Sequence, residues 1–416
     1  MAIKNIKVSN FKSFKDLDIE LNKLNVLIGA NASGKSNFIQ IFKFLRDISK
    51  EGLDNAVSMQ GGLKYLKNIC SDTSEAISLK IVSDQEFAYV AGKDKGFIWL
   101  SIPELTYEMA LQPKKKESTF TVSKDEITAR YEFYGLKIIP EKEKLGSGEV
   151  FLSNVDGKLA YDLHAPEAVP ISKDDIFPPF LKKGELPSKD TLLQNHFFHI
   201  PVFYPRQEKS FTDISIYDFD PKQLNRAMPI NGKHQLEEDG SNLAIVLKDI
   251  LEDDDGHREF SNLIRNLLPF VGDLRIKQFA NRYLSLEFQE TYSPNLYLPA
   301  SLMSDGTINI AALIVALYFD ENPLIIIEEP ERNIHPSLIS KVVEMLKDAS
   351  ENKRIIVTTH NPEIIKHVGL DDILLISRNR EGISSISRPS ENEEVQIFLK
   401  NEIGIEELYI QNLLAF

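Results

Sequence analysis

The start of the chain shows three successive hydrophobic patterns. Apolar and polar residues alternate over residues 6–8 and 17–21, which predicts two strands with one buried face each. A continuous apolar run at residues 26–28 is typical of a strand that is covered on both faces. Beyond a glycine-rich stretch, large apolar residues recur from Phe38 to Ile48 at helical spacing. The opening is therefore predicted to be strand, loop and helix.

The pattern changes over residues 75–205. Short strand-like stretches, such as 96–102 and 128–134, alternate with clusters of lysine, glycine and proline. Residues 242–271 return to helical spacing, and residues 273–300 resemble two strands that end in a proline-bearing turn. We therefore predict a mostly β insertion over residues 76–240, followed by a helical arm and strands over residues 241–300.

The last third alternates short apolar strands with helices. Strands are predicted at residues 324–327, 355–357 and 373–376, and Leu338, Val342, Met345 and Leu346 form one face of a helix between the first two. Alternating strands and helices predict a parallel sheet with helices on its faces, and hence an α/β fold. Residues 1–75 and 301–416 are predicted to be the two parts of this α/β domain.

Composition and charge narrow the class of protein. A chain of 416 residues is too long for one ordinary core, which favours two domains or one domain with a large insertion. With a net charge of −14, the chain lacks the overall positive charge that is typical of proteins that bind nucleic acid over much of their surface. The single cysteine, Cys70, excludes an intrachain disulfide framework and fits a reducing compartment. With no signal-like start and no apolar run of about 20 residues, we expect a soluble cytoplasmic protein without a membrane partner.

Residues 29–36 carry the strongest chemical signal. They read Gly-Ala-Asn-Ala-Ser-Gly-Lys-Ser and fit the phosphate-loop pattern G-x-x-x-x-G-K-[ST]. The glycines let backbone N–H groups point at phosphate oxygens, while Lys35 supplies a charge to the β and γ phosphates and Ser36 a hydroxyl to Mg²⁺. The helix that follows offers its positive end to the same anion. The candidate nucleotide-binding residues of this loop are Gly29, Asn31, Ser33, Gly34, Lys35, Ser36 and Asn37.

A second signal stands at the end of the strand at residues 324–327. Two carboxylates, Glu328 and Glu329, follow the apolar run directly and precede Pro330. In a nucleotide hydrolase one such carboxylate holds the Mg²⁺ sphere and the next polarises the attacking water. We assign Glu328 to the metal and Glu329 to the water. ATP and Mg²⁺ are therefore the expected cofactors.

Two further motifs allow more than one reading. Ser304-Asp305-Gly306 precedes an apolar helix that is predicted to run to Phe319. Ser304 suits a plain helix N-cap, but with Gly306 and the helix end it also suits an anion site. His360 ends the strand at residues 355–357, where phosphate-handling residues gather in open α/β sheets, although it also suits a capping role.

In this order, the four motifs resemble the ATPase head shared by ABC proteins, the structural-maintenance-of-chromosomes family and RecF. The phosphate loop resembles Walker A, the strand ending in Glu328 and Glu329 resembles Walker B, Ser304-Asp305-Gly306 the signature motif, and His360 the switch histidine. Residues 10–14 are similar to the start of RecF-like proteins, which implies that Lys12 helps to bind nucleotide. The stretch from Glu328 to Glu331 followed by His335-Pro336 resembles the stand-alone AAA-type ATPases of the overcoming-lysogenisation-defect group.

The resemblance covers residues 1–70 and 240–416 and implies a sandwich dimer. In that family the signature serine and glycine of one subunit complete the γ-phosphate site of the other, so ATP would bridge two copies of this chain. Position 328 is Glu where most relatives outside the group have Asp. Gln60 and Gln85 are the candidates for the γ-phosphate-sensing glutamine. Relatives with a nuclease carry a longer C-terminal domain, so we expect no nuclease in this chain.

Three functions remain open from the sequence. The first is an ATP-dependent dimeric switch that controls a separately encoded effector, or DNA, in bacterial defence against phage. The second is a RecF-like, ATP-gated DNA-binding protein in repair, which keeps nucleic acid as a candidate partner. The third is the nucleotide-binding subunit of a transporter, although the long insertion between the phosphate loop and Ser304 argues against it.

Overall fold

The computed structural model describes residues 2–72, 74–84, 88–93, 96–114, 119–136, 142–167, 190–194, 210–393 and 404–411, together with residues 169, 172, 173, 186, 395 and 397. The chain folds into two compact units. One comprises Met1–Asn22, Asn31–Ile214 and Ser377–Ile386, and the other comprises Lys23–Ala30, Ser215–Ile376 and Ser387–Phe416. No helix in the described part of the chain is long and apolar enough to cross a bilayer.

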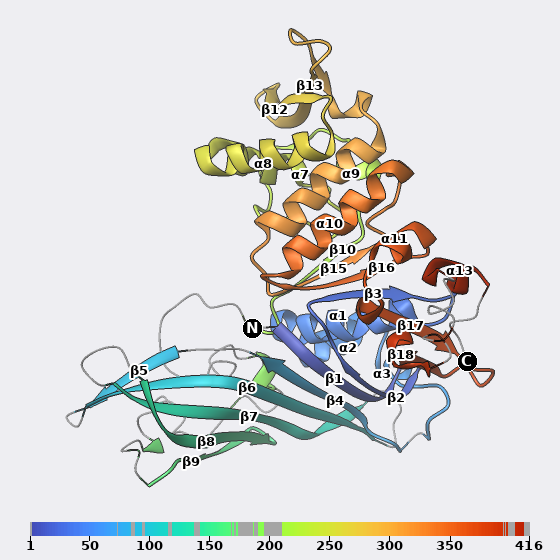
Figure 1. The fold of residues 1–416 in the computed structure, drawn as a ribbon. Coiled ribbons are helices and arrows are strands. Elements are labelled where there is room, and N and C mark those ends of the chain that lie inside the picture. The colour runs from blue at the N-terminus through green and yellow to red at the C-terminus, as the bar shows by residue number, and fades with distance from the viewer. Residues whose placement is uncertain are drawn as a thin grey trace. The chain divides into compact units, whose positions relative to one another are not determined.

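The first unit contains an antiparallel sheet of eight strands in the order β2-β1-β4-β6-β7-β8-β9, with β5 paired to β6 (Figure 1). Its strands are β1 (Ala2–Phe11), β2 (Phe14–Glu20), β4 (Ile77–Asp84), β5 (Ala88–Lys93), β6 (Gly96–Pro113), β7 (Phe120–Leu136), β8 (Lys142–Val155) and β9 (Lys158–His164). Alternation explains their burial, since Ile6 pairs with Ile19 and both side chains are buried, whereas Lys7 and Asp18 beside them face solvent.

Three helices follow the phosphate loop in the same unit. They are α1 (Lys35–Glu51), α2 (Leu53–Met59) and α3 (Leu63–Leu66). The predicted apolar face of α1 is buried, and the Phe38 ring meets Phe14 of β2 and Phe42 of its own helix edge-on. This packing places α1 against the start of the sheet.

The insertion contains far longer strands than the sequence predicted. Instead of short strands at 96–102 and 128–134, β6 spans 18 residues and β7 spans 17. The lysines and glutamates that interrupt the apolar pattern lie on the solvent face of the sheet, where Lys80 and Lys124 both pair with Glu108. Pro103 is tolerated in β6 because the register shifts there, between Ser101 and Glu104.

The second unit contains most of a six-stranded sheet in the order β10-β15-β16-β3-β17-β18, whose last strand belongs mainly to the first unit. These strands are β3 (Leu24–Ile28), β10 (Ile214–Tyr217), β15 (Leu324–Glu328), β16 (Arg354–Thr358), β17 (Ile373–Arg378) and β18 (Ser384–Ser387). The pairs β15–β16, β16–β3 and β3–β17 are parallel, as predicted. All five residues of β3 and of β16 are buried, as expected of continuously apolar strands in a parallel sheet.

The helices of the second unit form a shared buried core with this sheet. They are α6 (Pro221–Leu224), α7 (Leu243–Glu252), α8 (Asp254–Leu267), α9 (Asp305–Ile314) with a π-helical turn at Val315–Phe319, α10 (Ile339–Ser350), α11 (Pro362–His367) and α13 (Ile405–Ile410). Of these, α9 and α10 lie between the sheet and the helices α7 and α8 (Figure 1). Val26, Ile325 and Val357 of the strands share a buried cluster with Ile308 of α9 and Val342 of α10. The predicted α/β fold with helices on the sheet is therefore confirmed.

A smaller antiparallel sheet completes the second unit. It contains β11 (Met228–Pro229), β12 (Val271–Phe279), β13 (Tyr283–Glu290) and β14 (Tyr297–Pro299), in the order β11-β13-β12 with β14 paired to β13. The two strands predicted over residues 273–300 correspond to β12 and β13, and β14 is an additional short strand that ends at Pro299.

Candidate functional site

The phosphate loop joins β3 to α1 and requires glycine at position 34. Gly34 has a φ of +119°, a left-handed conformation that L side chains rarely adopt. A Cβ at this position would lie 2.4 Å from Ser384 Oγ and 3.0 Å from Ser13 Oγ. Both the backbone conformation and the packing therefore exclude a side chain here.

Two side chains from residues 377–386 fix the shape of this loop. Ser384 Oγ donates a hydrogen bond to the Ser33 carbonyl at 2.6 Å, and Arg378 Nη1 donates to the Ala32 carbonyl at 3.4 Å. Sequence reasoning missed both residues. No local pattern marks them, because Ser384 stands 351 positions after the residue that it holds.

The loop carries the features of an anion site. Helix α1 has 17 residues, and its N-cap residue, Gly34, has no side chain to cap it, as in helices whose positive N-terminal end faces a bound anion. Asn31 and Ser36 are exposed, and Lys35 is partly buried at the first helical position. The Ser33 hydroxyl is buried and has no hydrogen-bond partner among the described residues. These groups fit a bound phosphate.

The turn between β1 and β2 lies against the first turn of α1. Asn37 Nδ2 donates a hydrogen bond to Ser13 Oγ at 2.8 Å, and Ser384 N donates to the Ser13 carbonyl at 2.8 Å. Lys12 precedes Ser13 with a φ of +49°, and burial lowers the pKa of its ammonium group. The nucleotide-binding role of Lys12 stays a prediction.

The acidic strand end in the second unit has the predicted local structure. Glu328 is the last residue of β15 and is paired in register with Thr358 of β16. Glu329 then leaves the sheet with a φ of +47°, and its N–H donates to the Thr358 carbonyl at 2.9 Å. A non-glycine residue in this conformation is uncommon and turns the chain sharply. The two carboxylates therefore differ in environment although they are adjacent in sequence.

Arg332 forms an ion pair with the Glu329 carboxylate. Its guanidinium donates to Glu329 Oε2 from Nη2 at 3.1 Å and from Nε at 3.3 Å. Its Nη1 donates to Asp218 Oδ1 at 2.9 Å and to the Phe219 carbonyl at 3.0 Å. Sequence reasoning missed Arg332, whose only local signal is its place three residues after Glu329.

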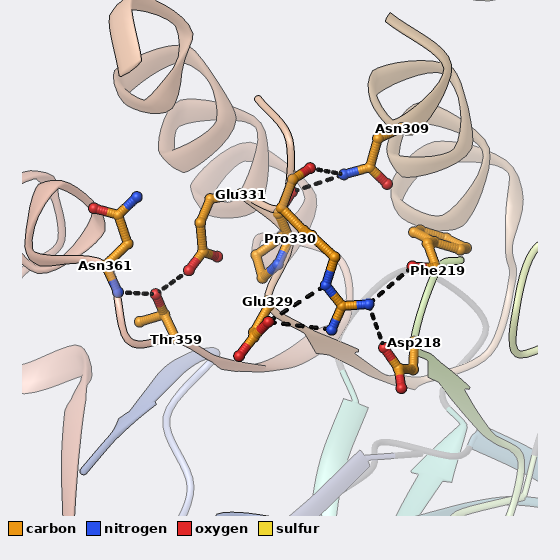
Figure 2. A network of polar contacts seen from close by, with 9 residues as sticks. Asp218, Phe219, Asn309, Glu329, Pro330, Glu331, Thr359 and Asn361 are labelled. Carbon is orange, nitrogen blue, oxygen red and sulfur yellow. Dashed lines mark hydrogen bonds and ion pairs between the residues drawn. The ribbon is translucent and has the colours of Figure 1, made fainter. Parts of the chain in front are cut away.

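Glu331 lies on the other side of the same turn and reaches the end of β16 (Figure 2). Thr359 Oγ1 donates to Glu331 Oε1 at 2.5 Å and accepts the Asn361 N–H at 2.9 Å. Glu331 Oε2 is buried without a hydrogen-bond partner among the described residues. Burial, reinforced by the charge of Glu329, raises the pKa of the Glu331 carboxyl group.

The start of α9 is fixed to the acidic turn. Ser304 caps the helix, since its Oγ accepts the Thr307 N–H at 3.2 Å, and it remains exposed. A Cβ on Gly306 would lie 2.4 Å from the Asn333 carbonyl oxygen. Asn309 Nδ2 donates to the carbonyls of Pro330, at 3.3 Å, and Arg332, at 2.9 Å. The capping reading of Ser304 is confirmed, and its anion-binding role stays a prediction.

His360 lies two residues after the end of β16 and is partly exposed. It does not cap α11 itself, because Asn361 is the N-cap and its Oδ1 accepts the Glu363 N–H at 2.9 Å. The switch role of His360 stays a prediction. Of the two candidate γ-phosphate-sensing glutamines, Gln60 ends α2, and Gln85 lies outside the described residues.

The predicted magnesium ligands offer suitable donors. Ser36 supplies an exposed hydroxyl and Glu328 a partly exposed carboxylate, and Mg²⁺ prefers such oxygen ligands alongside phosphate and water.

Two of the known proteins that resemble this chain match most of its length, and a third matches a short part of it. An ATP/GTP phosphatase from Helicobacter pylori is 21% identical over 374 residues, which span 88% of this chain and 86% of that relative. The endonuclease GajA from Bacillus cereus is 34% identical over 86 residues, which span 20% of this chain and only 13% of GajA. A solved structure of the SmcHead bound to the C-winged helix domain of ScpA has 15% identity and a TM-score of 0.52, and the match covers 93% of this chain and 97% of that chain.

The chain has the fold of the SMC head domain. It belongs to the family described as "AAA domain, putative AbiEii toxin, Type IV TA system", whose sequence profile matches residues 24–366. The narrower assignment to the overcoming-lysogenisation-defect group stays a prediction.

Proposed function

We propose that this protein is an ATP-dependent switch, which binds Mg-ATP through its phosphate loop, hydrolyses it and closes as a dimer. The observation that carries nucleotide binding is the start of α1, an uncapped helix end behind a glycine-dependent loop. In this proposal Gly29, Asn31, Ser33 and Gly34 cradle the phosphates, Lys35 neutralises their charge and Asn37 holds the turn that carries Lys12.

Glu329 is the proposed water-polarising residue. Its left-handed backbone turns it away from the line of β15, while Glu328 and Ser36 provide the oxygen ligands for Mg²⁺. When bound, Mg²⁺ would neutralise phosphate charge during transfer. The relative named as an ATP/GTP phosphatase supports hydrolysis rather than binding alone.

Dimer closure is supported by the exposed start of α9. The Ser304 hydroxyl and the first N–H groups of this helix form an anion-binding end in the second unit. We infer that Ser304 and Gly306 of one copy serve the nucleotide on another copy, with His360 near the transferred phosphate. The likeness in fold to SMC heads is consistent with such a sandwich.

The family description names a toxin of a type IV toxin–antitoxin system, and one relative is an endonuclease. These names support a role in bacterial defence against phage, in which the ATP-bound dimer controls a separately encoded effector. DNA is the second candidate for the controlled partner.

Nucleotide binding is tested by Lys35→Ala, with Lys50→Ala as the matched control. Lys50 is an exposed lysine in the last turn of the same helix. Lys35→Ala is expected to lower ATP affinity or turnover at least about 100-fold, because it removes the charge aimed at the phosphates. Lys50→Ala is expected to leave both unchanged. Equal activity of the two variants would overturn the proposed function.

A further inference from the structure

The turn after β15 holds a third carboxylate to which the proposed chemistry gives no role. Glu331 comes two residues after Glu329, and its side chain points toward the end of the neighbouring strand β16 (Figure 2). There it accepts the Thr359 hydroxyl at 2.5 Å. This side-chain contact joins the turn that carries Glu329 to the loop that carries His360, beside the backbone hydrogen bond from the Glu329 N–H to the Thr358 carbonyl.

Thr359 is itself held on three sides. Its N–H donates to the Leu27 carbonyl at 3.2 Å, and its Oγ1 both donates to Glu331 and accepts the Asn361 N–H at 2.9 Å. Thr359 and Asn361 are the two neighbours of His360 in sequence. The backbone before His360 is therefore held by the Leu27 carbonyl and the backbone after it by the Thr359 hydroxyl, which Glu331 orients.

The burial of the Glu331 carboxyl group lowers the free energy of unfolding, so this position is not chosen for stability. A carboxylate oxygen without a hydrogen-bond partner is unfavourable in a buried place, and Glu331 Oε2 is such an atom among the described residues. The anchor on the other side of the turn is independent, since Asn309 holds the Pro330 and Arg332 carbonyls rather than Glu331.

We propose that Glu331 is a positioning residue for His360. Through Thr359 it couples the position of the switch loop to that of the acidic turn, so that His360 and Glu329 take up their working positions together. The inference rests on the proposed function, because it assumes that His360 acts in ATP turnover.

The test is a double-mutant cycle on ATP turnover, with kcat and KM measured for Glu331→Ala, His360→Ala and the variant with both substitutions. Glu331→Ala is expected to lower kcat about 10- to 100-fold with KM changed less than about 2-fold, because misplacing a working group mainly affects the chemical step. In the His360→Ala background, Glu331→Ala is expected to change kcat less than about 2-fold.

Conservative variants separate positioning from loss of folding. Glu331→Gln keeps an oxygen that accepts the Thr359 hydroxyl and is expected to restore most of the turnover. Thr359→Val removes the hydroxyl at similar volume and is expected to reproduce Glu331→Ala, whereas Thr359→Ser is expected to stay active. Glu344→Ala removes an exposed carboxylate from α10 and serves as the matched control, with turnover unchanged.

Two results would overturn the inference. Equal losses from Glu331→Ala with and without His360 would show that Glu331 acts by another route. An unchanged kcat in His360→Ala would also overturn it, since there would be no working histidine to position. Either result leaves nucleotide binding intact, whereas failure of the proposed function appears separately as insensitivity to Lys35→Ala. If Glu331→Ala does not fold, Thr359→Val and Thr359→Ser are compared in the native chain and in His360→Ala. A loss of kcat in Thr359→Val that disappears in His360→Ala supports the inference, and a loss that persists there overturns it.

Discussion

Glu331 also makes stability depend on pH. Its pKa is raised above the ordinary value of 4.5, first by burial and then by the charge of Glu329. A raised carboxyl pKa contributes stability that is complete below the ordinary value and is lost as pH rises through the folded-state value. Ionisation of Glu331 as pH rises therefore lowers the stability of the native chain.

This ionisation gives the first prediction. Glu331→Gln keeps the Thr359 hydrogen bond but does not titrate, so its melting temperature is expected to exceed that of the native chain at pH 7–8. The difference should shrink as pH falls toward about 4.5. Thermal unfolding of both proteins at several pH values measures this difference in melting temperature. A difference that does not change with pH would show that Glu331 does not have a raised pKa in the folded chain.

Gly34 offers a second test at the scale of one residue. In Gly34→Ala, the new residue must adopt a positive φ and its Cβ would clash with Ser384 Oγ. In Gly62→Ala, the residue must also adopt a positive φ, of +94°, but no atom lies within 4 Å of the new Cβ. Gly62→Ala is expected to cost about 1–2 kcal/mol of unfolding free energy and to leave ATP binding intact. Gly34→Ala is expected to cost more and to abolish binding. Denaturant unfolding and nucleotide titration of both variants distinguish the packing clash from the backbone penalty.

At the scale of elements, the starts of α8 and α9 can be compared directly. Asp253 caps α8 through the Gly256 N–H at 2.8 Å, and Ser304 caps α9 through the Thr307 N–H at 3.2 Å. Replacing either cap with alanine is expected to cost about 1 kcal/mol of stability. Only Ser304→Ala should also lower ATP turnover, by about 10-fold or more. Equal turnover in the two variants would reduce Ser304 to a structural cap.

The elements also show where sequence reasoning succeeds. The run ending at Ile28, the glycine loop and the amphipathic α1 are consecutive in the chain, so their local patterns were enough to predict them. The strand that ends at Glu328 was also predicted from the sequence, because buried parallel strands are continuously apolar. The long strands β6 and β7 were predicted too short, because charged residues on an exposed sheet face interrupt an apolar pattern without ending the strand.

Contacts between distant segments explain what sequence reasoning missed in the candidate site. Ser384 and Arg378 reach the phosphate loop only after β17 has paired with β3. Arg332 meets Asp218 across 114 positions, and Glu331 meets Thr359 across 28. Each contact depends on which strands become neighbours, and no local periodicity records that choice.

At the scale of the whole molecule, the proposed function requires that ATP brings two copies of the chain together. The proposal places Ser304 and Gly306 of one copy against the nucleotide held by Lys35 and Ser36 of another. Substitution at either place should therefore impair assembly. A mixture of Lys35→Ala and Ser304→Ala chains can still form one complete site per dimer, so mixing is expected to restore part of the turnover. Mixed variants that remain as inactive as each alone would contradict a site shared between copies.

The most direct test is the mass in solution of the native chain and of Glu329→Gln, each with and without Mg-ATP. Glu329→Gln keeps the side-chain shape but removes the carboxylate that would polarise water. The account predicts that this variant loses turnover and accumulates as a dimer or larger assembly only when Mg-ATP is present. A mass that is the same in all four conditions, together with surviving turnover in Glu329→Gln, would contradict both the closure by ATP and the role of Glu329.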